Sequence, residues 1–324
     1  MMPEFAYVRA RSLREALSEL SSDGARVHAG GTDLLGCLRD GVFSATKVVS
    51  MSGLSELRGI EETAGGVRIG ALVTLSELAD NPLIKGRYPA LSQGASEAAS
   101  PQLRNQGTVA GNLCQKPRCW YYRGEFNCLR KGGDRCFAVA GENHYHAILG
   151  GERCYIVHPS DTAPALVAYG AVVHTAGSKG KREIPAEKFF VLPAHDVTRE
   201  TVLESGEIVT EIVLSSPTQG VRSSYHKVRA RQSWDFALAG VALVLQLKGE
   251  IVGDAKIVLT GAAPVPWRSF EAEEAVTGKV LNEDVARKAA SAAVRRARPL
   301  EHNGYKIPLF RGLIEEALIA LTRS

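Results

Sequence analysis

The sequence lacks a hydrophobic run long enough to cross a membrane. Its longest apolar stretch, FALAGVALVLQL at residues 236–247, is shorter than the ~20 residues that a transmembrane helix needs. A buried β-strand explains this stretch better. No charged and then apolar leader precedes residue 20, so we expect neither a membrane span nor a secretory signal.

Two phosphate-binding patterns and any strong charge imbalance are also missing. Neither GxGxxG nor GxxxxGK(S/T) occurs, which excludes a Rossmann dinucleotide fingerprint and a Walker phosphate loop. The net charge is only +4, and the basic residues are dispersed apart from the short clusters RKGG, KGKR and RRAR. A solvated surface accounts for such clusters, so no nucleic-acid partner is expected.

The 324 residues have a globular composition and suit two domains. Apolar periodicity predicts alternating strands and helices, with helices at 12–24, 88–100, 282–297 and 307–323, strand-then-helix units at 25–41 and 65–80, and strands at 207–214, 223–228, 236–247 and 250–262. Residues 154–177 are predicted to form a strand, a turn, a helix and a second strand. The polar segment SSPTQG at 215–220 indicates a domain boundary near residue 220.

Two glycine-rich segments are candidate phosphate-binding loops. AGGTDL at 29–34 follows a predicted strand and opens a predicted helix, where free amides and the positive helix end hold an anion. LRNQGTVAGNLCQ at 103–115 is predicted to be a loop with free amides. A tight strand-to-helix turn explains AGGTDL alone better than a phosphate site does, but two such loops facing each other would wrap a dinucleotide from both sides.

Four segments in chain order identify a resemblance: HAGGTDLL (28–35), RNQGTVAGNLCQ (104–115), HPSDTAPAL (158–166) and YHKVRARQSWDFA (225–237). Together they resemble the FAD-binding medium subunit of the molybdenum hydroxylases, the family of xanthine dehydrogenase and carbon monoxide dehydrogenase. The resemblance covers nearly the whole chain. It implies an α+β fold, with an FAD-binding domain of the vanillyl-alcohol-oxidase (PCMH) type in two subdomains at 1–220, and a C-terminal α+β domain at 221–324 with a small antiparallel sheet and helices.

The resemblance also implies which residues contact FAD. The pyrophosphate would lie against Ala29, Gly30, Gly31, Thr32, Asp33, Leu34 and Leu35, and the pyrophosphate and flavin side against Asn105, Thr108, Gly111, Asn112 and Leu113. Asp161 would reach the ribitol or adenosine region, and Lys227 would lie near the isoalloxazine, where a positive charge favours the anionic reduced flavin. Without the resemblance, Asp161 is a helix N-cap and Lys227 a surface lysine on a strand. Ala110 stands where the family has a glycine. Its methyl group would limit how closely the backbone approaches the phosphate.

A cysteine-rich insertion at 116–154 has little apolar periodicity. Cys119, Cys128, Cys136 and Cys154 follow the spacing C-x8-C-x7-C-x17-C, and without a secretory signal such a group more often binds a metal than forms disulfides. Four thiolates suit a cubane iron–sulfur cluster. Zinc is an equally sound interpretation of the residues, with His144, His146 or His158 able to replace one thiolate.

The resemblance favours the iron–sulfur interpretation. The medium subunits of periplasmic aldehyde oxidoreductase and 4-hydroxybenzoyl-CoA reductase carry a similar insertion that binds a 4Fe-4S cluster, and RCWYY, NCLRKGGDRC and ERCYIVHPSD resemble it at all four cysteines. On this mapping Cys37 and Cys114 are small semi-buried residues, and His144 and His146 are hydrogen-bonding loop residues. The aromatic run Trp120, Tyr121 and Tyr122 would shield the cluster from water.

The implied function is that of an oxidoreductase subunit with no catalytic acid or base of its own. It would carry electrons between 2Fe-2S clusters of a partner small subunit and an external acceptor or donor. A partner large subunit would hold molybdopterin and act on an aldehyde, an aromatic compound or an N-heterocycle, or reduce an aromatic acyl-CoA. Two alternatives remain at this point: a stand-alone flavin oxidase or dehydrogenase of the same fold, and a zinc-stabilised interaction module.

The location of the protein follows from the same expectations. Its own sequence predicts a cytoplasmic protein. An export signal on a partner subunit would instead carry the assembled complex to the periplasm.

Overall fold

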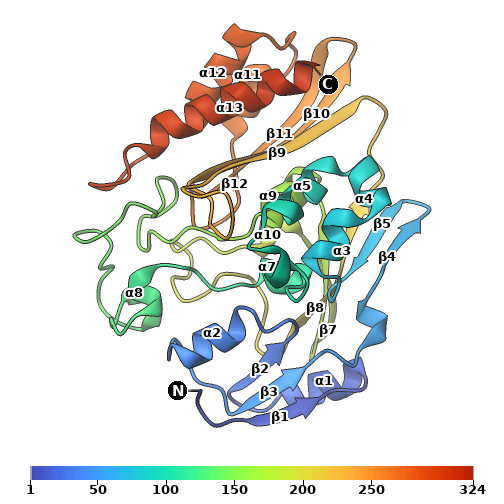
Figure 1. The fold of residues 1–324 in the computed structure, drawn as a ribbon, viewed down its shortest axis with the longest axis vertical. Helices are drawn as coiled ribbons and strands as arrows, with labels where there is room; N and C mark the ends of the chain where they lie inside the picture. The colour runs from blue at the N-terminus through green and yellow to red at the C-terminus, as the bar shows by residue number, and fades with distance from the viewer. Residues whose placement is uncertain (1, 324) are drawn as a thin grey trace.

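The computed structural model describes residues 2–323 and contains three β-sheets that follow one another along the long axis of the molecule (Figure 1). The N-terminal unit is a parallel sheet of order β1-β3-β2. Its strands are β1 (Ala6–Arg9), β2 (Ala25–His28) and β3 (Lys47–Ser50), connected by the helices α1 (Leu13–Leu20) and α2 (Leu34–Arg39). Ser12 caps α1 by accepting a hydrogen bond from the Glu15 amide.

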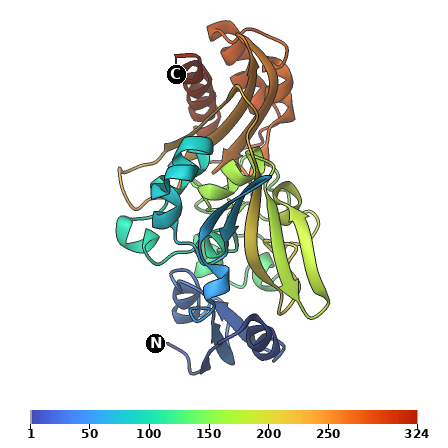
Figure 2. The ribbon, with the colours of Figure 1, turned by 90° about the vertical axis from the view of Figure 1, so that its right-hand side faces the viewer.

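A five-stranded antiparallel sheet forms the middle of the molecule, in the order β4-β5-β8-β6-β7 (Figure 2). Its strands are β4 (Ile60–Thr63), β5 (Gly66–Gly70), β6 (Val172–Gly177), β7 (Gly180–Pro185) and β8 (Ile208–Ser215). A set of short helices accompanies it: η1 (Ser55–Leu57), α3 (Leu75–Asp80), α4 (Pro82–Arg87), α5 (Pro89–Glu97), α6 (Pro101–Arg104), α7 (Val109–Leu113), α9 (Thr162–Ala168) and α10 (Ala186–Phe189). The apolar sides of α5 and α9 pack on this sheet in one buried core.

The C-terminal part is an antiparallel sheet of order β12-β11-β10-β9 that is covered by helices on one face (Figure 1). It comprises β9 (Val221–Val228), β10 (Ala239–Lys248), β11 (Ile251–Thr260), β12 (Trp267–Arg268), α11 (Phe270–Val276), α12 (Glu283–Ala293) and α13 (Lys306–Arg323). The predicted 236–247 strand is β10, and Gly249 at φ 63° allows the tight turn to β11. The predicted α+β class is therefore confirmed.

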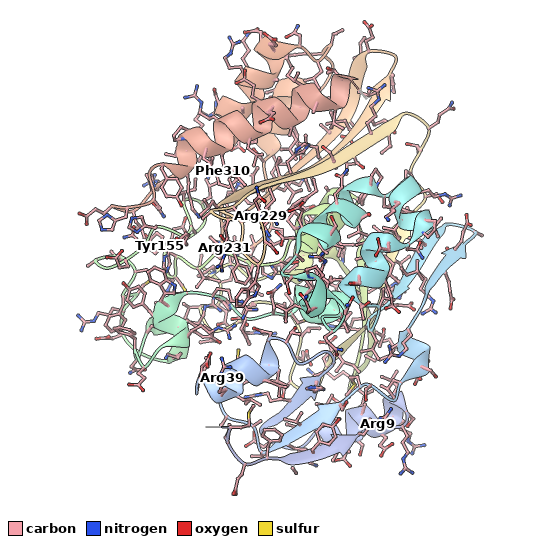
Figure 3. The ribbon with its side chains drawn as sticks, viewed as in Figure 1. Arg9, Arg39, Tyr155, Arg229, Arg231 and Phe310 are labelled. Atoms are coloured by element: carbon pink, nitrogen blue, oxygen red, sulfur yellow. The ribbon has the colours of Figure 1, made fainter. Side chains whose placement is uncertain are left out.

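The cysteine-rich insertion runs between the N-terminal unit and the C-terminal domain (Figures 1 and 3). It contains only the short helices α8 (Trp120–Arg123) and η2 (Leu129–Lys131), as its lack of periodicity predicted. The strand expected at the start of 154–177 does not form, because residues 154–160 are irregular. No helix within residues 2–323 is long and apolar enough to span a bilayer.

Lys306, at the start of α13, ties the insertion to the C-terminal sheet. Its buried ammonium donates hydrogen bonds to the carbonyls of Tyr145 (3.1 Å) and Gly261 (2.8 Å). Burial lowers the pKa of Lys306 from its ordinary value near 10.5 to about 7. Between these values the unfolded chain binds one proton more than the folded chain, so this lysine makes stability rise with pH.

We expect Lys306→Met to remove that dependence. In the parent protein Lys306 adds a slope of about 1.4 kcal/mol per pH unit to the free energy of unfolding between pH ~7 and ~10.5. Denaturant unfolding at several pH values measures the slope for both proteins. An unchanged slope in the variant would show that Lys306 keeps an ordinary pKa in the fold.

Candidate functional site

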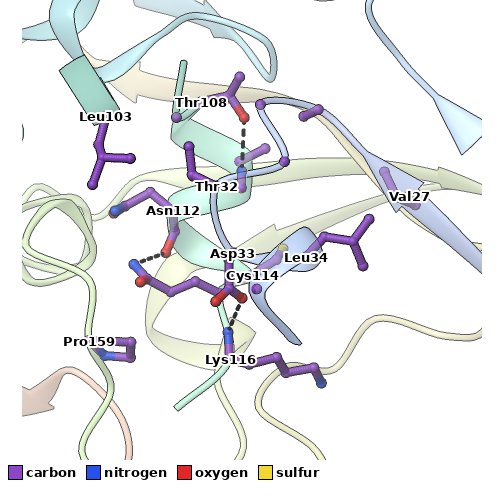
Figure 4. Close-up of a pocket in the computed structure, with 18 of the residues that line it drawn as sticks. Val27, Thr32, Asp33, Leu34, Leu103, Thr108, Asn112, Cys114, Lys116 and Pro159 are labelled. Atoms are coloured by element: carbon purple, nitrogen blue, oxygen red, sulfur yellow. Dashed lines mark hydrogen bonds between the residues drawn. The ribbon is translucent and has the colours of Figure 1, made fainter. Parts of the chain in front are cut away.

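A cavity of about 620 Å³ lies between the N-terminal unit and the middle sheet. Its walls come from the loop between β2 and α2, from α7 and from β8, and residues 234–236 of the β9–β10 loop close one end. Figure 4 shows Thr32, Asp33 and Leu34 on one side of it and Thr108 and Asn112 on the other. Its size is within the range of small-molecule and cofactor sites.

The first glycine loop presents unused backbone donors to this cavity. Within residues 2–323, the amides of Gly30, Gly31, Thr32 and Asp33 donate no hydrogen bond. Gly31 has φ 73°, a left-handed conformation that favours glycine. Backbone donors that the fold leaves unsatisfied at a cavity wall need an acceptor, and a phosphate oxygen is a suitable one.

The two glycine segments meet, as the sequence predicted. A Cβ placed on Gly30 would lie 1.8 Å from the Gln106 carbonyl oxygen and 3.2 Å from the Gly107 Cα. Only a glycine permits this approach of one backbone to the other. The contact brings both segments to the same wall of the cavity.

The second segment is not the open loop that its composition predicted. It forms α6 and α7, and Ser100 and Thr108 accept the N-cap hydrogen bonds of these helices. The amides of Val109, Ala110 and Gly111 donate within the protein. Composition missed the helices because each is held by its cap and by contacts with the middle sheet rather than by propensity. The segment therefore lines the cavity with side chains and the open face of Gly111.

Most of the predicted cofactor-contacting residues line this cavity: Ala29, Gly30, Gly31, Thr32, Asp33, Leu34, Thr108, Gly111, Asn112 and Asp161. The other predicted contacts, Leu35, Asn105, Leu113 and Lys227, are not part of its lining. Leu35 is solvent-exposed, and Asn105 accepts a hydrogen bond from Ser76 at 2.6 Å. Leu113 packs in the core. Ala110, the departure from the family pattern, lines the cavity and also packs against that core.

Asp161 and Lys227 form a buried ion pair beside the cavity. The Lys227 ammonium, with no exposed surface, lies 2.8 Å from Asp161 Oδ2, and the Tyr225 hydroxyl donates to Oδ1 at 2.6 Å. Burial raises the pKa of the Asp161 carboxyl, and the Lys227 charge partly offsets that rise. Lys227 is thus not a surface lysine, and its charge reaches the cavity only through Asp161. Asp161 stands at the start of α9 without capping it, since Ser160 accepts the Ala163 amide instead.

The sequence analysis missed two groups of lining residues. One is apolar and comes from η1, from β8 and from two connecting segments: Leu57, Leu72, Leu203 and Ile208. The other is basic and follows α7 in the chain: Lys116, Arg118 and Arg123. No local pattern marks the apolar group. Lys116 and Arg118 lie between the second glycine segment and Cys119, and Arg123 follows Cys119 in α8. The closeness of all three to these two motifs in the chain was the available signal.

Two strained residues meet at one end of the cavity. Ala99 at φ 47° and Trp234 at φ 52° have positive φ without being glycine. The Trp234 amide donates to the Ala99 carbonyl at 3.3 Å, and both residues line the cavity. Such conformations gather at functional sites because the surroundings must hold them in place.

The four predicted metal ligands lie in one neighbourhood. Cys119 packs against two small apolar clusters, one containing Cys128 and the other Cys154. Cys136 interacts electrostatically with both Cys119 and Cys154. All six cysteines are free thiols. Within residues 2–323, however, no three His, Cys, Asp or Glu side chains are close enough to hold a single metal ion.

The surroundings of these thiols are polar and partly unsatisfied. His146 Nε2 lies 3.2 Å from Cys119 Sγ, and His146 Nδ1 is buried without a partner in the described residues. Burial raises the pKa of Cys154, and the Arg130 charge partly offsets this. Two Arg130 nitrogens, Nε and Nη2, are also buried without a partner there. Buried unpaired donors around a set of thiols fit an anionic group at this position.

Other predictions about the insertion have mixed outcomes. Tyr122 is buried beside Cys128, and Tyr121 packs against Phe126 and Phe137. Trp120 is 52% exposed and so does not shield the thiols. His158 is buried against the Leu113 carbonyl, and His144 lies on the surface beside Glu142. Cys37 and Cys114 are buried and half-buried, with thiol pKa values that burial raises to about 11 and about 12.

The fold and the two apposed glycine segments define a protein that binds a phosphate-containing cofactor. A model of the FAD binding domain in molybdopterin dehydrogenase matches residues 3–217, and a model of the CO dehydrogenase flavoprotein C-terminal domain matches residues 223–321. The chain therefore belongs to the FAD-binding medium subunits of the molybdenum hydroxylase family, and it is an oxidoreductase subunit.

Individual relatives agree with this assignment. The chain is 39% identical to the aldehyde oxidoreductase FAD-binding subunit PaoB of Escherichia coli (strain K12), over 85% of this chain and 86% of that protein. It is 31% identical to the glyceraldehyde dehydrogenase medium chain of Sulfolobus acidocaldarius, over 93% and 92%. Carbon monoxide dehydrogenase from Hydrogenophaga pseudoflava has a similar structure, with a TM-score of 0.80 and 27% identity over 100% of this chain and 99% of that one.

Proposed function

We propose that this chain is the FAD- and 4Fe-4S-carrying electron-transfer subunit of a heteromeric molybdenum-containing hydroxylase or dehydrogenase. It passes electrons between 2Fe-2S clusters of a small partner subunit and an external acceptor or donor. A large partner subunit holds molybdopterin and the substrate. The observation that carries the proposal is the contact between Gly30 and Gln106, which joins two glycine segments at one cavity wall in a chain of this family.

Aldehydes are the substrate class that we propose for the complex. Two relatives that share 30% identity or more are named as an aldehyde oxidoreductase FAD-binding subunit and a glyceraldehyde dehydrogenase medium chain. The substrate would bind in the partner subunit, so this chain contributes no catalytic residue to its oxidation. Assay of the complex with aldehydes and with N-heterocycles tests the class.

The residues of the cavity fit FAD. The free amides of Gly30 to Asp33 would hold the pyrophosphate, and the open face of Gly111 would leave room for it. Leu57, Leu72, Leu203 and Ile208 would pack against a ring system and exclude water. Bound FAD supplies both one-electron and two-electron exchange.

The residues of the insertion fit a cubane cluster better than zinc. A zinc ion draws its sulfur ligands to about 2.3 Å from one centre, and no three His, Cys, Asp or Glu side chains within residues 2–323 are placed to hold a single metal ion. A cubane places four iron atoms between its ligands and needs more widely spaced thiolates. The buried Arg130 and His146 nitrogens would then face an anionic cluster.

The two alternatives make different demands. A stand-alone flavin oxidase of this fold would need its own substrate site, whereas the relatives are named as an FAD-binding subunit and a medium chain. A zinc-stabilised interaction module would not need free loop amides at a cavity of cofactor size. Both observations favour the electron-transfer subunit.

The test is the content of iron, acid-labile sulfide, zinc and FAD in protein isolated without oxygen. We expect about four irons and four sulfides per FAD, as a cubane requires, with little zinc. Stoichiometric zinc, or FAD without iron, would contradict the cluster while leaving the flavin assignment intact. A colourless protein without FAD would contradict the whole proposal.

A further inference from the structure

An ionic network joins the first glycine loop to the cysteine insertion. Asp33, the residue that follows the GGT turn, accepts a hydrogen bond from the Lys116 amide at 2.7 Å (Figure 4). Its carboxylate also pairs with Arg118 and, at 2.7 Å, with Arg123 on α8. Asp33 occupies the N-cap position of α2 but forms no side-chain cap there. Its side chain therefore binds residues of the insertion and does not cap its own helix.

The network continues to the predicted cluster ligands. The Lys116 ammonium pairs with Glu200, which also accepts a hydrogen bond from Arg130 at 2.6 Å. The Arg130 side chain is 1% exposed and its charge acts on the Cys154 thiol. The backbone itself connects the network to a predicted ligand, since Lys116 and Arg118 lie within three residues of Cys119.

The charges of this network do not balance within it. Four cations, Lys116, Arg118, Arg123 and Arg130, are matched by two carboxylates, Asp33 and Glu200. Two positive charges are in excess in a largely buried region, where an uncompensated charge is costly. At one end, Asp33, Lys116, Arg118 and Arg123 line the FAD cavity. At the other end, Arg130 faces the thiols, so each end of the network can receive an anionic cofactor.

We propose that this network couples the binding of FAD to the loading of the insertion with its iron–sulfur cluster. This inference rests on the proposed function, because it requires the cluster. An anionic cluster would fix Arg130, and through Glu200 it would hold Lys116 and the segment that carries Arg118 and Arg123. These groups in turn hold Asp33 and with it the loop whose free amides take the pyrophosphate. Coupling between two binding sites is reciprocal, so FAD also favours cluster loading.

Arg123 is the positioning residue that isolates this coupling. It is the direct ion-pair link between α8 and the glycine loop, and its Nε also donates to the Pro117 carbonyl at 2.8 Å. Arg123→Gln removes one of the two arginine charges that pair with Asp33, and Arg123→Lys restores a charge. Arg268→Gln is the matched control. It removes a similarly buried arginine ion pair, to Glu273 in the C-terminal domain, with side-chain exposure of 19% against 15% for Arg123.

The experiment measures the Kd of FAD by flavin fluorescence for the full chain, iron-loaded and after removal of iron with a chelator. We expect removal of iron to raise the Kd at least about fivefold in the parent protein. The ratio of the two Kd values should fall to about one in Arg123→Gln, recover in Arg123→Lys and stay at the parent value in Arg268→Gln. Lys116→Met, which cuts the link to Glu200 at a more exposed side chain, should lower the ratio as well and serves if Arg123→Gln does not fold.

The outcomes separate this inference from the function on which it rests. A parent chain that binds iron but shows the same Kd with and without it overturns the coupling alone. An Arg123→Gln protein that keeps the parent ratio assigns the coupling to other residues and overturns the network. A chain that never binds iron overturns the cluster, and the coupling with it.

Discussion

Gly111→Val should abolish stoichiometric FAD binding while leaving the fold intact. Gly111 lies in α7 on the wall of the cavity. Apart from the backbone of α7 and the two adjacent residues, a Cβ built there would have the Thr108 hydroxyl, at 3.0 Å, as its one neighbour within 4 Å among residues 2–323. A valine side chain would therefore project into the cavity. Overpacking of a close-fitting site costs about 1–3 kcal/mol, which lowers the affinity for FAD roughly 10- to 100-fold.

The check is FAD content after purification, together with the melting temperature of the flavin-free protein. Gly86→Val is the matched control, because Gly86 lies in α4, is exposed and has nothing within 4 Å of its Cβ position. It should keep FAD. Gly30→Ala should instead lose both fold and flavin, since its Cβ would overlap the Gln106 carbonyl. Full FAD occupancy in Gly111→Val would place the pyrophosphate elsewhere.

The sequence was most informative where one residue type is required by backbone geometry. Gly30 and Gly31 could be singled out because only glycine fits their close contact and positive φ. Long periodic segments such as β10 and α13 were also predictable, since burial of one face sets their pattern. Both signals are local, and the first of them singled out glycines that line the cavity.

The remainder of the site depends on contacts between distant segments. Leu57 and Leu203 line one cavity although 146 positions separate them, and no local pattern records that meeting. The strand pattern alone predicted that Lys227 is a surface residue. Its side chain is buried instead, because its ammonium forms an ion pair with Asp161, which follows the insertion in the chain. Asp33 was predicted to contact the pyrophosphate, and its carboxylate instead forms ion pairs with two arginines of the insertion. Charge pairing across long sequence separations therefore decided the roles that local reasoning left open.

Two thiols of one apolar cluster allow the predicted iron–sulfur ligands to be tested against simple packing. Cys128 and Cys37 both belong to the cluster formed with Val42 and Tyr122, and both are buried. Cys128 is a predicted ligand, whereas Cys37 lies on α2 and its thiol is 3.9 Å from Asp33 Oδ1. Serine has nearly the volume of cysteine but is a poor ligand for iron, so the same substitution at both positions separates ligation from packing.

Cys128→Ser should therefore lose most of the bound iron, to below about half of the parent content, because a cubane needs all four thiolates. FAD should stay largely bound. The Kd of FAD should rise no more than it does when iron is removed from the parent protein. Cys37→Ser should keep its iron. Iron and flavin analysis of both variants provides the measurement. Unchanged iron content in Cys128→Ser would show that Cys128 is not a ligand. Loss of iron in Cys37→Ser alone would show that Cys37 on α2 is the fourth ligand instead.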